Sequence, residues 1–373
     1  MERFHSNVNS RVLLPKADSF EGARTQRALN LRQGRTLSRD NLRSAASSAY
    51  VPVESMQAQS QSTEAKPVVH TMQYAMQETP AELLKTNTPL FCVRIVLAAL
   101  IIALASILMV SGNILLFAIG LLLQGAMYVH LVELQHSVLH LHAFSNARVN
   151  RFVGVLLGLP MLISFSDFQY RHLRHHKHLG TPLNSETFSY HTTSLGGWGF
   201  LRGMLDYSRW QTIAKRIFKA YTNQQISDGM NPLMESRIRQ EYRVFGFLLS
   251  CAILTSLITG SFWPIALWLM PLVTAEPVHF LLELPEHLGM KAHSNPNVFE
   301  NTRIWGGSWF ARWYSHNTNY HLMHHFNQLV PMHNLPKLEA HLSNQIPAAS
   351  RSKSYPDFFL QVIRGEIRAE DGD

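Results

Sequence analysis

Residues Leu90–Val110 read LFCVRIVLAALIIALASILMV, an apolar run of 21 residues with a single charge. At about 1.5 Å of rise per residue, a helix of this length crosses a hydrocarbon core about 30 Å thick. The one charge, Arg94, lies near the start of the run, where its long side chain can reach the membrane interface. The run predicts a membrane-spanning helix and decides the class of the fold.

Three further apolar runs extend the pattern to four transmembrane helices arranged as two hairpins. Ile114–Leu134 follows the first run after the short turn Ser111-Gly112-Asn113. Phe245–Gly260 and Phe262–Leu284 form the second pair, with almost no chain between them. Helices joined by such short turns lie antiparallel to one another. The chain is therefore predicted to be an all-α, multi-pass membrane protein.

The polar segments around these helices predict a helical cap at one membrane face. The run Phe152–Phe165 is too short to cross a membrane comfortably and predicts a re-entrant or interfacial segment. Residues 186–243 are polar and basic and resemble an interfacial helix, with an ordinary soluble loop as the alternative. Residues 1–75 are rich in Ser, Arg, Gln and Asn, which predicts a disordered tail ahead of a membrane domain at 76–373.

The distribution of Lys and Arg predicts which membrane face carries the cap. Neither connecting turn, 111–113 or 260–261, contains a basic residue, so the basic residues lie on the opposite side. Cytoplasmic segments are the ones enriched in Lys and Arg. Residues 135–243 and 285–373 are therefore predicted at the cytoplasmic face, of either a bacterial inner membrane or the endoplasmic reticulum.

The composition excludes several other classes of protein. Hydrophobic residues make up 46% of the chain, which rules out wholesale disorder. The two cysteines, Cys92 and Cys251, both lie inside apolar runs, which rules out a disulfide scaffold. The formal net charge of +8 is explained by topology and by anionic membrane lipid, so no nucleic acid partner is predicted.

Histidine is the most informative residue type in this sequence. Of the 20 histidines, eight lie in residues 130–178 and eight more in residues 279–333. Three spacings stand out, namely His136-x3-His140, His172-x2-His175-His176 and His321-x2-His324-His325. On a helix, positions i, i+3 and i+4 share a face, so each box can direct two or three imidazoles at one point. His287 follows the fourth apolar run and can reach the same place.

These nine histidines predict a metal site with more than one ion. Imidazole suits zinc, copper, iron and nickel, and nine ligands are too many for one metal and about right for two. Two metals with open positions indicate redox or hydrolytic chemistry. The predicted ligands are His136, His140, His172, His175, His176, His287, His321, His324 and His325.

Four other metal chemistries fit the sequence less well. Carboxylate-bridged di-iron bundles need paired Glu-x-x-His motifs, and Glu133-x2-His136 is the single match. The HExxH motif of zinc proteases is absent. A haem-binding electron carrier would leave most of the histidines idle. A histidine-rich membrane metal transporter is the non-enzyme alternative, although its site would lie near the bilayer midplane rather than beyond the helix ends.

The histidine segments and their flanks resemble those of the membrane fatty acid desaturase/hydroxylase superfamily. The resemblance covers roughly residues 90–365. It rests on three stretches, which are His136-x3-His140-x3-Phe144, Tyr170-Arg171-His172-Leu173-Arg174-His175-His176 up to Pro182, and Asn317-Thr318-Asn319-Tyr320-His321-Leu322-Met323-His324-His325-Phe326. Glu286-His287-Leu288-Gly289 followed by Asn301-Thr302-Arg303 resembles the segment before the third box.

This resemblance implies a di-iron centre, with two Fe ions held by the nine histidines, that activates O2 and removes hydrogen from an acyl chain. The implied activity is fatty acid desaturation within lipid metabolism and fatty acid biosynthesis. Hydroxylation of an acyl chain, or oxygenation of a specialised metabolite, is the enzyme alternative. No catalytic residue is predicted beyond the metal ligands.

A desaturase of this kind needs an electron donor on another chain. O2 takes up four electrons and the substrate gives two, while the sequence holds no flavin or dinucleotide fingerprint and no fused haem motif. Ferredoxin, or cytochrome b5 with its reductase, is the expected partner at the cytoplasmic face.

Two departures from the family pattern concern residues near the boxes: Ser137 replaces an acid after the first histidine, and Asn184 lies in the stretch where an Asp often follows the second box.

Overall fold

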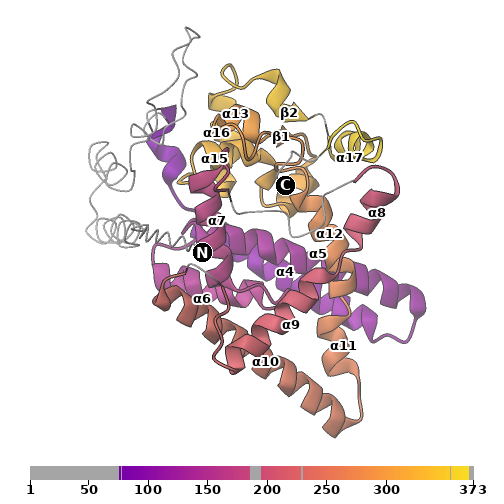
Figure 1. Ribbon diagram of the computed structural model, residues 1–373. Helices are drawn as coiled ribbons and strands as arrows, with labels where there is room; N and C mark the ends of the chain where they lie inside the picture. Colours follow the sequence, from indigo (N-terminus) through magenta and orange to yellow (C-terminus); the bar gives the residue numbers. More distant parts are fainter. Residues whose placement is uncertain (1–74, 77, 185–194, 228–229, 353, 369–373) are drawn as a thin grey trace, which may run out of the picture. The chain divides into compact units, whose positions relative to one another are not determined.

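The computed structural model of the protein describes residues 75–76, 78–184, 195–227, 230–352 and 354–368 (Figure 1). Apart from Ala75, the tail predicted at residues 1–75 lies outside the described residues. The described chain is mostly helical, and its one sheet is a parallel pair of two-residue strands, β1 (Ile304–Trp305) and β2 (Arg351–Ser352). Among the described residues, four helical segments are long and apolar enough to cross a membrane, namely Thr88–Met109, Ile114–Leu139, Pro232–Thr259 and Trp263–Glu283. The predicted fold class is thereby confirmed at the level of helix content and span number.

The first two of these segments, α4 (Thr88–Met109) and α5 (Ile114–Leu139), pack directly against each other. A Cβ atom at Gly120 of α5 would lie 2.5 Å from the backbone oxygen of Ala105 in α4, so only glycine permits this approach. The Asn113 side chain accepts hydrogen bonds from the backbone N–H groups of Leu115 and Leu116 and so begins α5 immediately after the turn. Much of the outer surface of α4 consists of exposed apolar side chains, as a lipid-facing helix requires.

Helix α5 runs five residues beyond the predicted end at Leu134. Its second half is buried on nearly all sides, and the Gln135 side-chain amide donates there to the backbone oxygens of Gly154 and Ile163. Because these partners compensate for burying a polar side chain, the helix continues past the apolar run. The extension brings His136 into the interior of the protein.

The segment predicted at Phe152–Phe165 is divided between two helices. It contains the second half of α6 (Ala147–Gly158), a connecting loop and the first residue of α7 (Phe165–His178). Helix α7 begins with a side-chain cap, since the Ser164 hydroxyl accepts a hydrogen bond from Asp167 N–H. The beginning of α7 is thereby fixed beside α10, against which it packs.

The polar region between the two pairs of long helices contains α8 (Trp198–Met204) and α9 (Ser208–Tyr221). Residues 185–194 of this predicted region lie outside the described residues. Helix α9 is amphipathic, since it buries Ile213 and Ala220 while Gln211 and Lys215 are exposed. Its buried face packs on the first half of α10 (Pro232–Thr259), beside Ile238.

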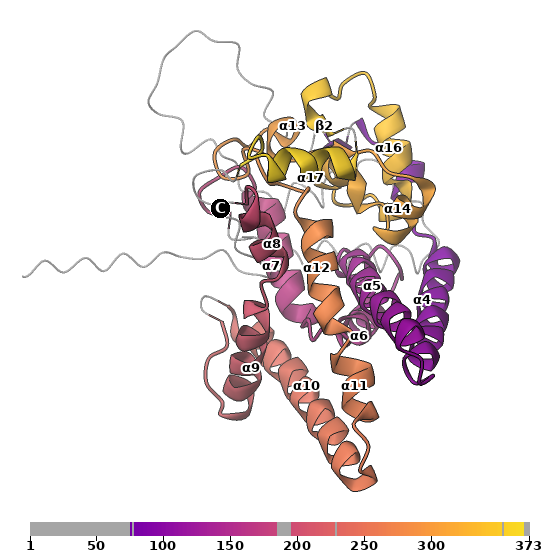
Figure 2. The ribbon, with the colours of Figure 1, turned by 90° about the vertical axis from the view of Figure 1, so that its right-hand side faces the viewer.

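The fourth span is interrupted, whereas the sequence predicted one continuous helix over Phe262–Leu284. It consists of α11 (Trp263–Leu269) and α12 (Leu272–Glu283), which meet at Met270 and Pro271 (Figure 2). Proline has no backbone N–H to donate and crowds the preceding turn, so the helical hydrogen bonding is broken there. Helix α12 packs on α5 and ends close to His287.

The C-terminal region consists of short helices gathered near the end of α12 (Figure 2). Leu322, Met323 and Phe326 form its core with Leu335 and Leu338. Its helices are α13 (Val298–Asn301), α14 (Trp309–Tyr314), α15 (His321–Phe326), α16 (Leu335–His341) and α17 (Tyr355–Ile363), with 3-10 turns at Thr318–Tyr320, Met332–Asn334 and Ala348–Ser350. The 3-10 turn Ala81–Leu84 joins this core through Leu83.

Candidate metal centre

The nine histidines predicted as ligands come together in two groups. The first group is His136, His140, His172, His176 and His324, and the second group is His175, His287, His321 and His325. Within each group the candidate ligand nitrogens all lie within 4.8 Å of one another. The residues come from α5 and its C-cap, from α7, from the segment after α12 and from α15. Four separate parts of the chain therefore supply the two groups.

The spacing of the nitrogens fits bound metal ions. In the first group His136 Nε2 lies 2.8 Å from His172 Nε2 and 3.1 Å from His324 Nε2. In the second group His287 Nε2 lies 3.1 Å from His175 Nε2 and 3.0 Å from His321 Nε2. Two nitrogens bound about 2.1 Å from one ion at a right angle are about 3.0 Å apart. Each group therefore has the spacing of ligands around a single ion.

An unpaired buried nitrogen in the first group also fits a bound metal ion. His140 Nε2 is buried and has no hydrogen-bonding partner among the described residues. A buried nitrogen without a partner is costly, and a metal ion would satisfy its lone pair. The donor set is all imidazole, which suits iron, zinc or copper.

Helix geometry explains how each box divides its histidines. Successive residues on a helix are separated by about 100°, so positions i and i+4 differ by about 40° and position i+3 lies about 60° to the other side. On α7, His172 and His176 join the first group while His175 joins the second. On α15 the pair His321 and His325 joins the second group while His324 joins the first. Each HxxHH box thus contributes to both groups.

Burial keeps these imidazoles in the form that binds metal. The pKa values of His140, His176, His321, His324 and His325 are lowered well below the usual histidine value, mainly by burial and further by the neighbouring imidazoles. A histidine must be neutral to donate its lone pair to a metal. Near neutral pH these five side chains are therefore neutral and ready to bind an ion.

The comparison with known families agrees with this geometry. Residues 112–355, which include all nine histidines, match the fatty acid desaturase family. The chain belongs to this family. No curated protein matches the chain. Members of the family are oxidoreductases with a di-iron centre, and the two histidine groups of this member could hold its metal ions.

Two asparagines orient ligands of the second group in this desaturase-family chain. His175 Nδ1 lies 3.0 Å from Asn184 Oδ1, and His287 Nδ1 lies 2.8 Å from the Asn301 backbone oxygen. If Nδ1 carries the proton and donates it, Nε2 is left to face the group. Sequence analysis assigned no role to either asparagine. Two features of the sequence could have pointed to these roles. One is the departure from the family pattern at Asn184, and the other is the Asn301-Thr302-Arg303 motif.

Arg303 connects two ligand segments of the second group. Its guanidinium donates to the backbone oxygen of Leu288, next to His287, and its own backbone oxygen accepts from Leu322 N–H, next to His321. The side chain also lies over the Phe358 ring of α17, 5.0 Å from the ring centre. Burial lowers the pKa of Arg303 to about 10, which leaves it charged at neutral pH.

Carboxylates lie beside the histidines, although sequence analysis assigned them no role. Glu286 Oε2 is 3.6 Å from His321 Nε2. Glu133 accepts a hydrogen bond from the Thr318 hydroxyl on the segment leading to α15. These oxygens could partner the metal ligands or carry protons near them.

The other histidines of this region make packing contacts outside the two groups. His130 Nδ1 lies 2.6 Å from the Tyr314 backbone oxygen, and His316 Nδ1 lies 2.8 Å from an Arg94 guanidinium nitrogen. His142 Nε2 lies 3.0 Å from the Gln328 backbone oxygen. These three histidines are therefore held by polar contacts of their own.

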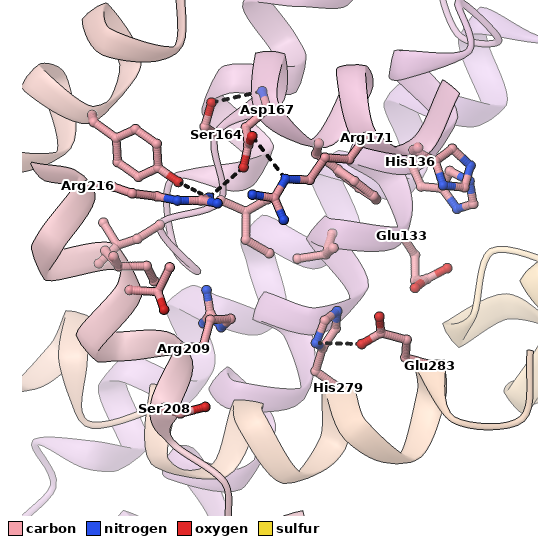
Figure 3. A pocket seen from close by; sticks show the side chains of 18 of the residues that line it. Glu133, His136, Ser164, Asp167, Arg171, Ser208, Arg209, Arg216, His279 and Glu283 are labelled. Atoms are coloured by element: carbon pink, nitrogen blue, oxygen red, sulfur yellow. Dashed lines mark hydrogen bonds and ion pairs between the residues drawn. The ribbon is translucent and has the colours of Figure 1, made fainter. Parts of the chain in front are cut away.

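A polar cavity of about 330 Å³ adjoins the first group (Figure 3). It is bounded by α5, α7, α9, the first half of α10, α12 and the loop before α7. His136 and His172 form part of its wall, so a substrate in the cavity would reach the first group. Arg171, Arg209 and Arg216 also line it. We refer to it below as the polar cavity.

Proposed function

We propose that the protein is a membrane di-iron oxidoreductase that desaturates an acyl chain with O2. The observation that carries the proposal is the division of nine histidines into two groups with nitrogen spacings near 3 Å. Membership of the fatty acid desaturase family supports it. A metal transporter would need neither this paired arrangement nor a substrate cavity beside it.

The proposed ligands of one iron are the first group, and those of the other iron are the second group. Two irons bound there would activate O2, the oxidant that takes hydrogen from an unactivated C–H bond. The residues of the chain bind and orient the substrate. Val132, Ile163 and Phe168 offer apolar contacts in the polar cavity, and Glu133 and Glu286 offer carboxylates that can hold a proton near the histidines.

An external electron donor is part of the proposal. Arg171, Arg174 and Lys177 are exposed on α7, the helix that carries the second box. Opposite charges steer association between proteins, so an acidic ferredoxin or cytochrome b5 would be attracted there. The rate of electron delivery should then fall as salt rises, because salt screens exposed charges.

The proposed topology places the four spans as two hairpins with both histidine groups at the cytoplasmic face. The turns after α4 and after α10 carry no Lys or Arg, and the long polar segments carry them instead. We also propose that residues 76–373 form the membrane domain and that the tail before it is dispensable for metal binding. A chain beginning at residue 76 should then bind as much iron as the full chain.

The test combines metal analysis with product analysis. Protein purified without oxygen should contain about two irons per chain, and O2 with an acyl substrate and an electron donor should give an unsaturated product by mass spectrometry. His321→Ala should lose about one iron and at least about 100-fold in turnover. His341→Ala, an exposed histidine of α16, is the matched control and should change neither. Full activity with zinc alone, or equal product from both variants, would refute the proposal.

A further inference from the structure

The polar cavity has an exposed mouth and a buried floor. Ser208 and Thr212 of α9 and Arg171 of α7 are exposed, and they mark the mouth. His136 and His172 are buried, and they mark the floor beside the first histidine group. Figure 3 shows Arg209 and Arg216 on one side of the cavity and Glu133 and His136 on the other. A ligand that enters must therefore pass the arginines before it reaches the histidines.

Charge is distributed unevenly between these two ends. Three carboxylates line the floor half, Glu133, Glu283 and Glu286, where they lie beside the histidines or beside His279. Their negative charge would offset that of metal cations bound by the histidine groups. The mouth half carries three guanidinium groups, and among the residues that the structure describes Asp167 is the one carboxylate that lines it.

The ion pairs leave the mouth with an excess of positive charge. Asp167 is shared, since its Oδ1 accepts from Arg171 Nε at 3.1 Å and its Oδ2 accepts from Arg216 Nη1 at 2.5 Å. Two guanidinium groups thus face one carboxylate. The Tyr242 hydroxyl accepts a further hydrogen bond from Arg216 and adds no charge at neutral pH. Arg209 is matched separately by Glu276, a fully buried residue of α12 behind the wall.

The guanidinium groups are positioned to bind an oxyanion. A guanidinium presents several N–H donors in a planar fork that fits carboxylate and phosphate oxygens. The Arg216 side chain is 16% exposed, so a partner there is shielded from water and its attraction is stronger than at an open surface. The Arg171 side chain, 48% exposed, can turn between Asp167 and an incoming group.

We infer that the polar cavity binds a small organic substrate by an anionic group, a carboxylate or a phosphate, held by Arg171 and Arg216 at the mouth. The rest of the molecule extends toward His136 and His172. The volume of about 330 Å³ lies at the small end of the range of about 300–1,000 Å³ typical of ligand pockets, which favours a short substrate. The inference deepens the proposed function, on which it rests, by assigning the substrate's charge and its orientation.

The test measures binding rather than turnover. Hexanoate, hexyl phosphate and hexanol share one chain length and differ in the charge of the head. Their binding to the full chain in nanodiscs of zwitterionic lipid is measured by equilibrium dialysis against empty nanodiscs. We expect one or both anions to bind at least about tenfold more tightly than hexanol. The two anionic arms show whether the cavity prefers the carboxylate or the phosphate.

Two variants and one control locate the binding site. Arg216→Gln and Arg171→Gln should each weaken anion binding about tenfold, because each removes charged hydrogen-bond donors. The other arginine stays paired with Asp167 in each variant. Lys215→Gln removes a neighbouring exposed charge of α9 that does not line the cavity, and it should bind the anions as the wild type does. Arg171→Gln keeps the test valid if Arg216→Gln does not fold.

The same measurements are repeated after the iron has been removed with a chelator. Arginine-dependent binding that persists in the metal-free protein supports the inference. Binding that disappears with the metal and is unchanged in both arginine variants would overturn it, since the anion would then be a metal ligand. Equal binding of hexanol and the anions would also overturn it. Arginine-dependent binding without any O2-dependent product would leave the inference standing while refuting the proposed function.

Discussion

Asn184 shows how one residue can support a metal site without touching the metal. Its side-chain oxygen lies 3.0 Å from His175 Nδ1, and its amide donates to the Ala292 backbone oxygen at 3.2 Å. The residue therefore connects α7 with the segment that follows His287. Partners of this kind fix which ring nitrogen faces the ion.

Replacing Asn184 should weaken metal retention at the second group. Asn184→Ala removes the acceptor from His175 Nδ1, and we expect iron to be lost to a chelator about 10- to 100-fold faster from one of two sites. Asn184→Asp keeps an acceptor oxygen and should restore slow release, which a merely space-filling role would not require. Iron release followed by absorbance measures both variants. Identical release from Asn184→Ala and the wild type would contradict this view of the residue.

Helix α7 is the element on which both histidine groups depend, and Glu241 of α10 fixes its beginning. The Glu241 carboxylate accepts from the Ser164 hydroxyl at 2.6 Å, from Ser166 N–H at 3.0 Å and from the Ser166 hydroxyl at 2.6 Å. Arg151 of α6 adds an ion pair at 2.9 Å. A carboxylate at a helix N-terminus also interacts favourably with the helix dipole.

Glu241→Ala should therefore reduce iron binding at both sites, unlike the single-site loss expected for Asn184→Ala. The substitution leaves buried donors of Ser164 and Ser166 unpaired, which costs on the order of 1–3 kcal/mol of folding free energy. Iron per chain and the thermal unfolding midpoint report the two effects. The control is Glu366→Gln, an exposed carboxylate that lies outside the cavity. A variant with one full site and one empty site would argue against α7 acting as a rigid unit.

Some of these elements could be predicted from the sequence, and others could not. The histidine spacings indicated helices because i, i+3 and i+4 share a face, and α7 and α15 are helical at those residues. The break at Pro271 was not predicted, because a hydropathy average over an apolar window does not register that proline has no backbone N–H to donate. The extension of α5 to Leu139 was not predicted, because Gln135 is polar and ends the apolar run. Its hydrogen-bonding partners, Gly154 and Ile163, are distant in sequence.

The assignment of each histidine to a group could not have come from spacing alone. His176 and His325 stack with ring centres 4.2 Å apart and yet belong to different groups. What separates them is the direction in which α7 and α15 present their side chains to each other, and this depends on tertiary packing. The polar cavity is hidden from sequence for the same reason, since its arginines come from both α7 and α9.

At the scale of the whole molecule, the testable property is the orientation in the membrane. Cys92 and Cys251 are exposed free cysteines, so both are first replaced by alanine. Single cysteines at Asn113 and Ser261 should then react with an impermeant reagent from outside the cell. Cysteines at Gln225 and Ser343, exposed residues of the two long polar segments, should react after the membrane is opened. Labelling of Gln225 and Ser343 from opposite sides would contradict the proposed topology.

The dispersed origin of the two histidine groups has a consequence for how the protein is made. Each group requires residues of α15, which lies in the last sixth of the chain, together with residues of α7. Neither set of ligands is complete while α15 is still being synthesised. Contacts between residues so distant in sequence form late. Iron should therefore be retained only after α15 has been synthesised, and a messenger that stops before codon 321 should yield a membrane-inserted chain that cannot retain the metal.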